Sequence, residues 1–214
     1  MATSKSKTYK TQEFGHLHGL DGISDAQIVE HQQLYAGYVK QVNTLNEHLA
    51  QLMGQGKASG TNPEFAELTR RLGFEYNGMI LHEYYFENLK PRGEAKPASG
   101  SGLTRALGES FGSVDTWMTD FQAIGEMRGV GWAVLFEDPV TDRLSNHWIT
   151  LHQEGIPAGF KPVLVMDVWE HAYMRDHKAT EKRAYIEAFF RNVDWALVER
   201  RLRAEASVRP AVAA

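Results

Sequence analysis

Three of the nine histidines in this 214-residue sequence have surroundings that suit chemistry rather than solvent. His82 lies within an apolar and aromatic stretch, residues 79–86, and His171 ends the segment Asp167-Val-Trp-Glu-His171, which follows a short apolar run. A carboxylate directly after a buried strand is costly unless something compensates its charge, and a metal cation is a common compensator. Asp167 is therefore predicted either to bind a metal or to cap the helix that follows, and this segment alone favours neither.

His31 is the third candidate. It lies seven residues before Tyr38, so in one α-helix the two side chains lie within about 20° of the same face. A single histidine on an apolar helix face is more often a hydrogen-bonded core residue than a ligand. Three imidazoles and one carboxylate together form a nitrogen and oxygen donor set that suits iron, manganese or zinc. We therefore predict a metal site from four residues, which are His31, His82, Asp167 and His171. Four other histidines lie in polar or loop-like segments and are expected to face solvent: His16, His18, His48 and His177.

Composition excludes several classes of protein. The chain has no cysteine, which excludes a disulfide framework, thiolate catalysis, an iron–sulfur cluster and a thiolate zinc site. The net charge of −4 argues against a protein that coats nucleic acid. The polar start, residues 1–10, does not resemble a secretory signal, and no apolar run is long enough to cross a bilayer. We expect a soluble, cytoplasmic protein with neither a nucleic-acid nor a membrane partner.

The elements expected to position these residues follow an α+β order. Helical periodicity predicts a helix capped by Ser24 and a second helix over about residues 63–89. The Pro-, Gly- and Ser-rich stretch over residues 90–102 is typical of a linker. After it, the sequence predicts helices over 102–111 and 113–127, strands over 131–137, 145–151 and 162–166, and one closing amphipathic helix over 180–203.

This order predicts two domains of an α+β fold. An N-terminal helical hairpin domain is expected over residues 12–90, and a C-terminal α/β domain over residues 102–203. The second domain would contain a small antiparallel sheet flanked by helices. Residues 1–11 and 204–214 are expected to be flexible ends.

Several motifs resemble one known family. The segment Asp167-Val-Trp-Glu-His-Ala-Tyr173 is similar to the D-x-W-E-H-A-Y signature of the iron/manganese superoxide dismutases. His82-Glu-Tyr-Tyr-Phe-Glu-Asn-Leu89 resembles the H-x-x-F-W-x-N-L stretch of the family's second helix, and residues 31–43 resemble its first-helix motif. Further short segments follow in family order, so the resemblance covers about residues 12–203.

The resemblance implies a dismutase with one iron or manganese ion per subunit, held by the four predicted ligands. By alternating reduction and oxidation, the metal would convert superoxide to dioxygen and hydrogen peroxide. Tyr38 matches the tyrosine near the family's substrate funnel, and Trp132 and Trp169 match its aromatic walls, although both are also ordinary core aromatics. Glu170 matches a residue that bonds across the family's dimer interface to the ligand histidine of the partner subunit. A homodimer is thus expected, and a tetramer is possible.

The first-helix motif departs from the family pattern. The family places eight steps between its first ligand histidine and the tyrosine, whereas His31 and Tyr38 are seven apart. Counting backwards without a gap would put Glu30 at the ligand position. We favour His31, because a helical bulge can be lost without moving the flanking face. The family also has a histidine between these two positions, and here Leu34 or Tyr35 replaces it. Met174 replaces the family's interface tyrosine. The two replacements together indicate a modified interface or proton path.

The group that hydrogen-bonds the metal-bound solvent is a second open point. In the family it is a Gln or His from one of two places. The first place is the position four residues before His82, where Gly78 has no side chain to donate, and this resembles the manganese-type arrangement. The second place is the strand before Asp167, where His152 is the best match and Gln153 and His147 are the alternatives. Iron and manganese remain equally compatible with the sequence.

Two other functions compete with the dismutase interpretation. One is a catalytically altered, dismutase-like metal-binding protein, which the shortened first motif favours. The other is a zinc hydrolase, for which no motif assigns a general base. Local cations could offset the overall negative charge near an anion's entrance, and Lys161, Arg175 and Lys178 lie in suitable segments, although surface solvation is their ordinary role.

Overall fold

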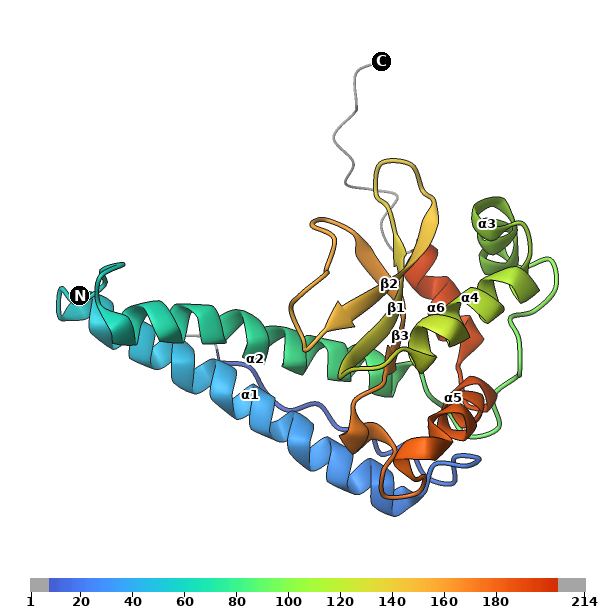
Figure 1. Ribbon diagram of the computed structural model, residues 1–214, viewed down its shortest axis with the longest axis horizontal. Helices are drawn as coiled ribbons and strands as arrows, with labels where there is room; N and C mark the ends of the chain where they lie inside the picture. Colours follow the sequence, from blue (N-terminus) through green and yellow to red (C-terminus); the bar gives the residue numbers. More distant parts are fainter. Residues whose placement is uncertain (1–7, 204–214) are drawn as a thin grey trace.

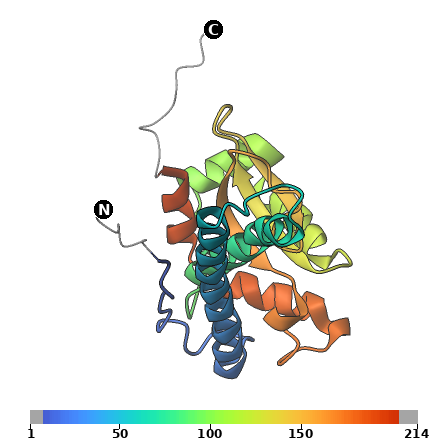
Figure 2. The ribbon, with the colours of Figure 1, turned by 90° about the vertical axis from the view of Figure 1, so that its left-hand side faces the viewer.

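Two long helices form the N-terminal part of the chain, of which the computed structural model describes residues 8–203. They are α1 (Asp25–Gly54) and α2 (Pro63–Glu87), and they pack antiparallel as a hairpin that projects from the rest of the molecule (Figures 1 and 2). The Ser24 hydroxyl caps α1 by accepting the backbone N–H of Gln27 at 3.1 Å. The buried positions of α1 recur at three- and four-residue intervals, so they form one face toward α2.

A three-stranded antiparallel sheet occupies the middle of the chain. Its strands are β1 (Gly131–Glu137), β2 (Leu144–Thr150) and β3 (Lys161–Asp167), in the order β2-β1-β3. The central strand β1 is buried along its whole length. Its register places Trp132 opposite Asp167 on β3. The tryptophan wall and the carboxylate predicted from the sequence are therefore neighbours across the sheet.

Shorter helices cover the sheet, as Figure 1 shows. They are α3 (Gly102–Phe111), α4 (Val114–Glu126), α5 (Lys182–Arg191) and α6 (Trp195–Arg203), with the 3-10 turns η1 (Glu170–Ala172) and η2 (Ala179–Glu181) between β3 and α5. The predicted α+β fold is confirmed: helices come first, followed by a small antiparallel sheet with helices around it. No helix among residues 8–203 is both long and apolar enough to span a membrane.

The prediction of a single closing helix over residues 180–203 is wrong. The chain leaves the helical conformation between α5 and α6, where Val193 forms an antiparallel bridge with Leu89. The Asn192 carbonyl accepts the N–H of Lys90 at 2.7 Å, and the Asn88 carbonyl accepts the N–H of Asp194 at 2.6 Å. These bonds to the segment after α2 satisfy backbone groups that a continuous helix would have bonded internally.

The two expected flexible ends fall largely outside the described residues, since residues 1–7 and 204–214 are not among them. The part of the N-terminal segment that is described lies along α1. The Tyr9 backbone N–H donates to Asn43 Oδ1 at 2.9 Å, and Asn43 Nδ2 donates back to the Tyr9 carbonyl at 3.0 Å.

One arginine links α2, β3 and α6. The Arg201 side chain is only 12% exposed and bonds the Glu87 carboxylate at 3.0 Å. The same guanidinium donates to Asn88 Oδ1 at 2.5 Å and to the Val163 carbonyl at 3.1 Å. It also lies 4.4 Å from the ring centroid of Tyr84. These contacts hold α2 against the end of the sheet, and α2 carries His82.

We predict that Arg201→Met lowers the free energy of unfolding by about 3 to 5 kcal/mol, because it leaves a partly buried carboxylate and several carbonyl acceptors without their donor. Urea unfolding followed by circular dichroism measures the change. The matched control is Arg200→Met, at an exposed position of the same helix, which should change the free energy by less than about 0.5 kcal/mol. Equal effects of the two substitutions would contradict this role.

Candidate metal centre

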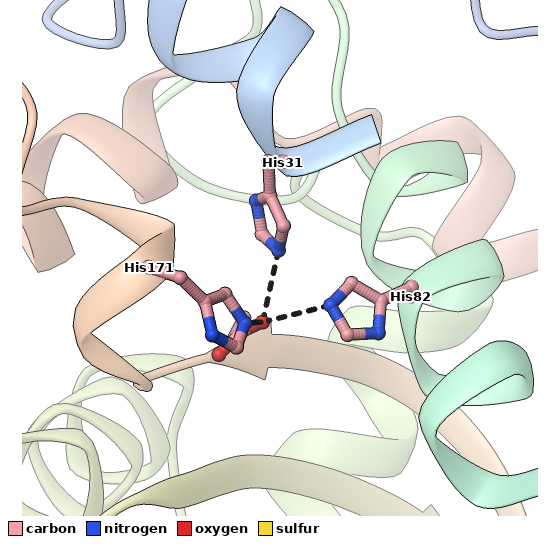
Figure 3. A group of neighbouring side chains, drawn as sticks. His31, His82 and His171 are labelled. Carbon is pink, nitrogen blue, oxygen red and sulfur yellow. Dashed lines mark hydrogen bonds and ion pairs between the residues drawn. The ribbon is translucent and has the colours of Figure 1, made fainter. Parts of the chain in front are cut away.

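Four side chains converge between the hairpin and the end of the sheet (Figure 3). Their donor atoms all lie within 4.8 Å of one another, and they come from α1, α2, the end of β3 and η1: His31, His82, Asp167 and His171. These are the four residues that the sequence predicted as ligands. Three of them are buried, and the His171 side chain is 25% exposed.

The Asp167 carboxylate is the centre of the group. Its Oδ2 lies 3.1 Å from Nε2 of both His31 and His171, and 3.6 Å from Nε2 of His82. Its Oδ1 accepts the backbone N–H of Trp169 at 2.8 Å. One oxygen therefore accepts a backbone N–H just before η1, which has no side-chain cap, and the other faces three imidazoles. Burial opposes ionisation, but the neighbouring His171 and His31 hold the pKa of Asp167 below its usual range.

His82 gives the clearest indication that the site suits a cation. Its Nδ1 lies 2.6 Å from the Gly78 carbonyl, which can only accept, so Nδ1 holds the proton and Nε2 is a bare lone pair. That buried Nε2 has no hydrogen-bond partner among the described residues, and it faces the Asp167 carboxylate. Two electron-pair donors that face each other in a buried site suit a shared cation. The donor set therefore fits a metal ion.

Burial favours the neutral form of the two fully buried imidazoles, which is the form that a metal ligand must have. Burial lowers the pKa of His31 below its ordinary value, although the Asp167 carboxylate acts in the opposite direction. Burial, followed by the neighbouring His31, lowers the pKa of His82 well below its ordinary value. Glu30, the alternative to His31, points elsewhere: its carboxylate is 56% exposed and pairs with Arg175.

The seven-residue spacing between His31 and Tyr38 is accommodated in a continuous helix, because α1 contains no bulge. Of the two residues considered for the missing histidine, Leu34 is 37% exposed and Tyr35 is fully buried. The Tyr35 hydroxyl donates to Glu83 Oε1 at 2.8 Å and accepts the N–H of Gln12 at 3.0 Å. Tyr35 therefore ties the N-terminal segment to α2 rather than reaching the site's entrance.

His152 joins the site through a hydrogen-bonded chain whose direction can be assigned. Trp132 Nε1, which can only donate, lies 3.0 Å from His152 Nδ1. Nδ1 is therefore the acceptor, and Nε2 carries the proton that it donates to the Tyr38 hydroxyl at 2.8 Å. Burial lowers the pKa of His152 to about 4, so the ring is neutral. The hydroxyl hydrogen of Tyr38 is left free to donate elsewhere.

The alternatives to His152 lie farther from this chain. His147 on β2 bonds the Ser145 hydroxyl at 2.8 Å, and its ring packs on Phe136. Gln153 is half-buried, and its Oε1 accepts the backbone N–H of His152 at 3.3 Å. Neither makes a described bond to Tyr38 or to the four converging residues.

The two tryptophans pack directly on the histidines. The Trp132 ring meets His82 edge-on, with centroids 4.9 Å apart. The Trp169 ring stacks on both His152 and His171, at centroid distances of 4.7 and 5.4 Å. Such packing fixes the orientation of the imidazole rings and excludes water from between them.

Two residues that hold the site together were not found by the sequence analysis. Gln27 Nε2 donates to the His171 carbonyl at 2.6 Å, which joins α1 to η1. The Tyr185 hydroxyl donates to the Asp167 carbonyl at 2.6 Å. Gln27 lies one helical turn before His31, so its place on the same face was a usable signal. Nothing local in the sequence indicates Tyr185, which belongs to α5.

The remaining histidines are not part of this centre. His16, His18 and His48 are exposed, as expected. His177 is half-buried, and its Nε2 donates to the Gly22 carbonyl at 2.9 Å. His177 therefore faces solvent only in part, because the turn after η1 packs against the segment that precedes α1.

Two surface hollows adjoin the centre and share Leu34. The first, called here the His171 hollow, is lined by Gln27, Glu30, His31, Leu34, Glu170, His171, Met174 and Arg175. The second, called here the Tyr38 hollow, is lined by Leu34, Tyr38, Gln41, Leu45, Arg71, Phe74 and Glu75. Leu34 and Met174 are both exposed on the His171 hollow, at 37% and 47%.

Fold and site together define an α+β protein in which three histidines and one aspartate form a mostly buried group that could hold one metal ion. Residues 99–201 match the family description "Iron/manganese superoxide dismutases, C-terminal domain". The chain is 34% identical over 198 residues to a "Superoxide dismutase [Fe]" of Aquifex pyrophilus, covering 90% of this chain and 91% of that protein.

Two further relatives differ in the metal that they are named for. A "Superoxide dismutase [Fe]" of Cupriavidus metallidurans is 36% identical over 82% of this chain and 86% of its own. A "Superoxide dismutase [Mn]" of Mycolicibacterium fortuitum is 33% identical over 84% of each chain. The chain belongs to the iron/manganese superoxide dismutase family, which confirms the resemblance seen in its motifs.

Gly78 tests how tightly the Tyr38 ring is held. A Cβ atom at Gly78 would lie 2.7 Å from Tyr38 Cδ1, whereas a Cβ at Gly73 on the same helix would meet nothing within 4 Å. We predict that Gly78→Ala displaces Tyr38, breaks its bond to His152 and costs about 1 to 3 kcal/mol of unfolding free energy. Gly73→Ala, the matched control, should stabilise by about 0.5 to 1 kcal/mol. Urea unfolding and a crystal structure of each variant provide the measurement, and an unmoved Tyr38 in Gly78→Ala would contradict it.

Proposed function

We propose that the protein is a superoxide dismutase whose single iron or manganese ion is held by His31, His82, Asp167 and His171. The observation that carries this proposal is the bare, buried Nε2 of His82 facing the Asp167 carboxylate, with the other two imidazoles on the same oxygen. The bound ion would supply the one-electron couple by which two superoxide anions and two protons become dioxygen and hydrogen peroxide. A catalytically altered protein is not favoured, because the relatives are named as dismutases.

The chain's own residues would supply a negative charge to the metal, donate a proton and exclude water from the site. Asp167 contributes one negative charge to the ion, which favours the higher oxidation state. Tyr38 would donate its free hydroxyl hydrogen toward substrate or solvent, while His152 Nε2 holds the hydroxyl oxygen in place. Burial, aided by the charge of Asp167, raises the pKa of Tyr38, so the phenol keeps its proton at neutral pH. Trp132 and Trp169 would exclude water and fix the imidazoles, in the way that outer contacts tune a metal site.

We predict that the protein loaded with iron or with manganese accelerates superoxide decay in stopped flow. The metal that gives the faster decay identifies the ion with which the enzyme works. His82→Gln should weaken metal binding by more than about 100-fold, since even residues behind the ligands cost 10- to 100-fold. Metal content per chain, measured by plasma mass spectrometry, should fall together with turnover. Variant His48→Gln, at an exposed histidine, is the control and should retain both.

Two outcomes would contradict the proposal in different ways. Stoichiometric metal binding without turnover by either loaded form would reject the dismutase activity. Full metal content in the His82→Gln variant would instead reject the assigned ligands.

We further propose that two copies form a dimer through the His171 hollow. Among residues 8–203, the exposed Glu170 carboxylate makes no hydrogen bond or ion pair, and Nδ1 of His171 has no partner because Nε2 faces Asp167. In a two-fold arrangement, Glu170 of each copy would accept a hydrogen bond from His171 of the other. The exposed Leu34 and Met174 side chains would add apolar area beside this pair.

We predict that Glu170→Gln raises the dimer dissociation constant at least about 10-fold, since a hydrogen bond to a charged acceptor contributes about 1.5 to 3 kcal/mol. Sedimentation velocity measures it and also distinguishes a dimer from a tetramer. Glu67→Gln, an equal charge change at an exposed position of α2, should leave assembly unchanged. A wild-type monomer at micromolar concentration would reject the interface.

A cytoplasmic location, compatible with the cysteine-free chain, is proposed as well and is tested by cell fractionation.

A further inference from the structure

The Tyr38 hollow contains an ion pair that the site described above does not use. Arg71 Nε lies 2.7 Å from Glu75 Oε1, one turn along α2. The Arg71 side chain is 53% exposed, whereas the Glu75 side chain is only 5% exposed. The cation of the pair therefore faces solvent, and its counter-charge is buried beneath it.

This cation is connected to the hydrogen-bonded chain of the site through one aromatic ring. The Arg71 guanidinium lies 4.5 Å from the Phe74 ring centroid. The Phe74 ring in turn lies 4.5 Å from the ring of His152 and 6.2 Å from the ring of Tyr38. Since Arg71, Phe74 and Tyr38 line the same hollow, an anion that approaches the Tyr38 hydroxyl from this side passes close to the guanidinium.

Two of the three cations named from the sequence are placed less favourably. Lys161 is only 25% exposed and pairs with Glu137 at 2.6 Å, at the far end of β3 from Asp167. Arg175 lines the His171 hollow and pairs with Glu30, whose carboxylate is itself 56% exposed. An incoming anion meets both charges of that pair. At Arg71 it meets the positive charge first, in a chain whose net charge of −4 would otherwise repel it.

We propose that Arg71 guides the superoxide anion into the Tyr38 hollow, and that the negative charge of the buried Glu75 beneath it offsets part of this attraction. The inference rests on the proposed dismutase function and adds the residue whose charge attracts the substrate. If the dimer covers the His171 hollow, the Tyr38 hollow remains as the open approach. Arg71 would act on the rate of encounter and not on the chemical step.

The test measures kcat/KM for superoxide by stopped flow at increasing ionic strength, using the metal-loaded full-length protein. Arg71→Gln is expected to lower kcat/KM about 3- to 10-fold at ~0.01 M salt, with the difference largely lost at ~0.5 M, because screening lengths fall from about 30 Å to a few Å. Arg70→Gln makes the same charge change at the neighbouring exposed position and should have a clearly smaller effect. Equal effects of the two variants, or a loss that does not depend on salt, would overturn the proposal.

Glu75→Gln separates guidance from a purely structural ion pair. It removes the negative charge and leaves Arg71 in place, so guidance predicts a higher kcat/KM at low salt. A structural pair predicts a loss from either substitution. Lower kcat/KM in both Arg71→Gln and Glu75→Gln would therefore overturn the proposal.

A second readout does not depend on turnover. Azide is a small monovalent anion, and its affinity for the iron-loaded protein can be measured by absorbance titration. Arg71→Gln should weaken azide binding several-fold relative to Arg70→Gln, and Glu75→Gln should strengthen it. If the wild-type protein turns over superoxide but the Arg71→Gln and Glu75→Gln variants bind azide as tightly as it does, guidance by Arg71 is rejected and the dismutase function is not. A wild-type protein without turnover would reject the dismutase function, while the order of azide affinities would still decide whether Arg71 attracts anions.

Discussion

The burial of one carboxylate, Asp167, is the constraint on which the rest of the structure depends. Its Oδ2 faces three imidazole nitrogens, two of them on fully buried neutral rings. An isolated buried charge costs a large desolvation free energy, and hydrogen bonds from neutral imidazoles offset only part of it. A cation among the four donors satisfies the carboxylate and the bare Nε2 of His82 together. A metal bound there would thus contribute to the stability of the folded core as well as to its chemistry.

The surrounding elements can be understood as the means of bringing four donors to one point. A long hairpin supplies His31 and His82 from facing helices, and the sheet ends at Asp167. Gln27 ties α1 to η1, and Tyr185 ties α5 to the Asp167 carbonyl. Since each of these bonds joins segments distant in the sequence, the site forms only when the whole chain is folded.

Much of the fold was predictable because local patterns decide local structure. The strand over residues 131–137 and the helix over 102–111 have the predicted bounds. The closing helix was mispredicted at Asn192, where bonds to Asp21 and to the segment after α2 outweigh helical periodicity. The seven-residue spacing of His31 and Tyr38 posed no obstacle, since a continuous helix keeps both on one face.

The sequence by itself determined the fold class, the family and the four residues able to bind a metal, because helical and strand periodicity and a long signature motif are local properties. Only the tertiary structure decided how these residues are used. It placed the ring of His152 in hydrogen-bonding contact with both Trp132 and Tyr38. It also set Leu34 beside Met174 and turned the Arg71 charge outward over Glu75. Such outcomes depend on contacts between segments far apart in the chain, and no local pattern encodes them.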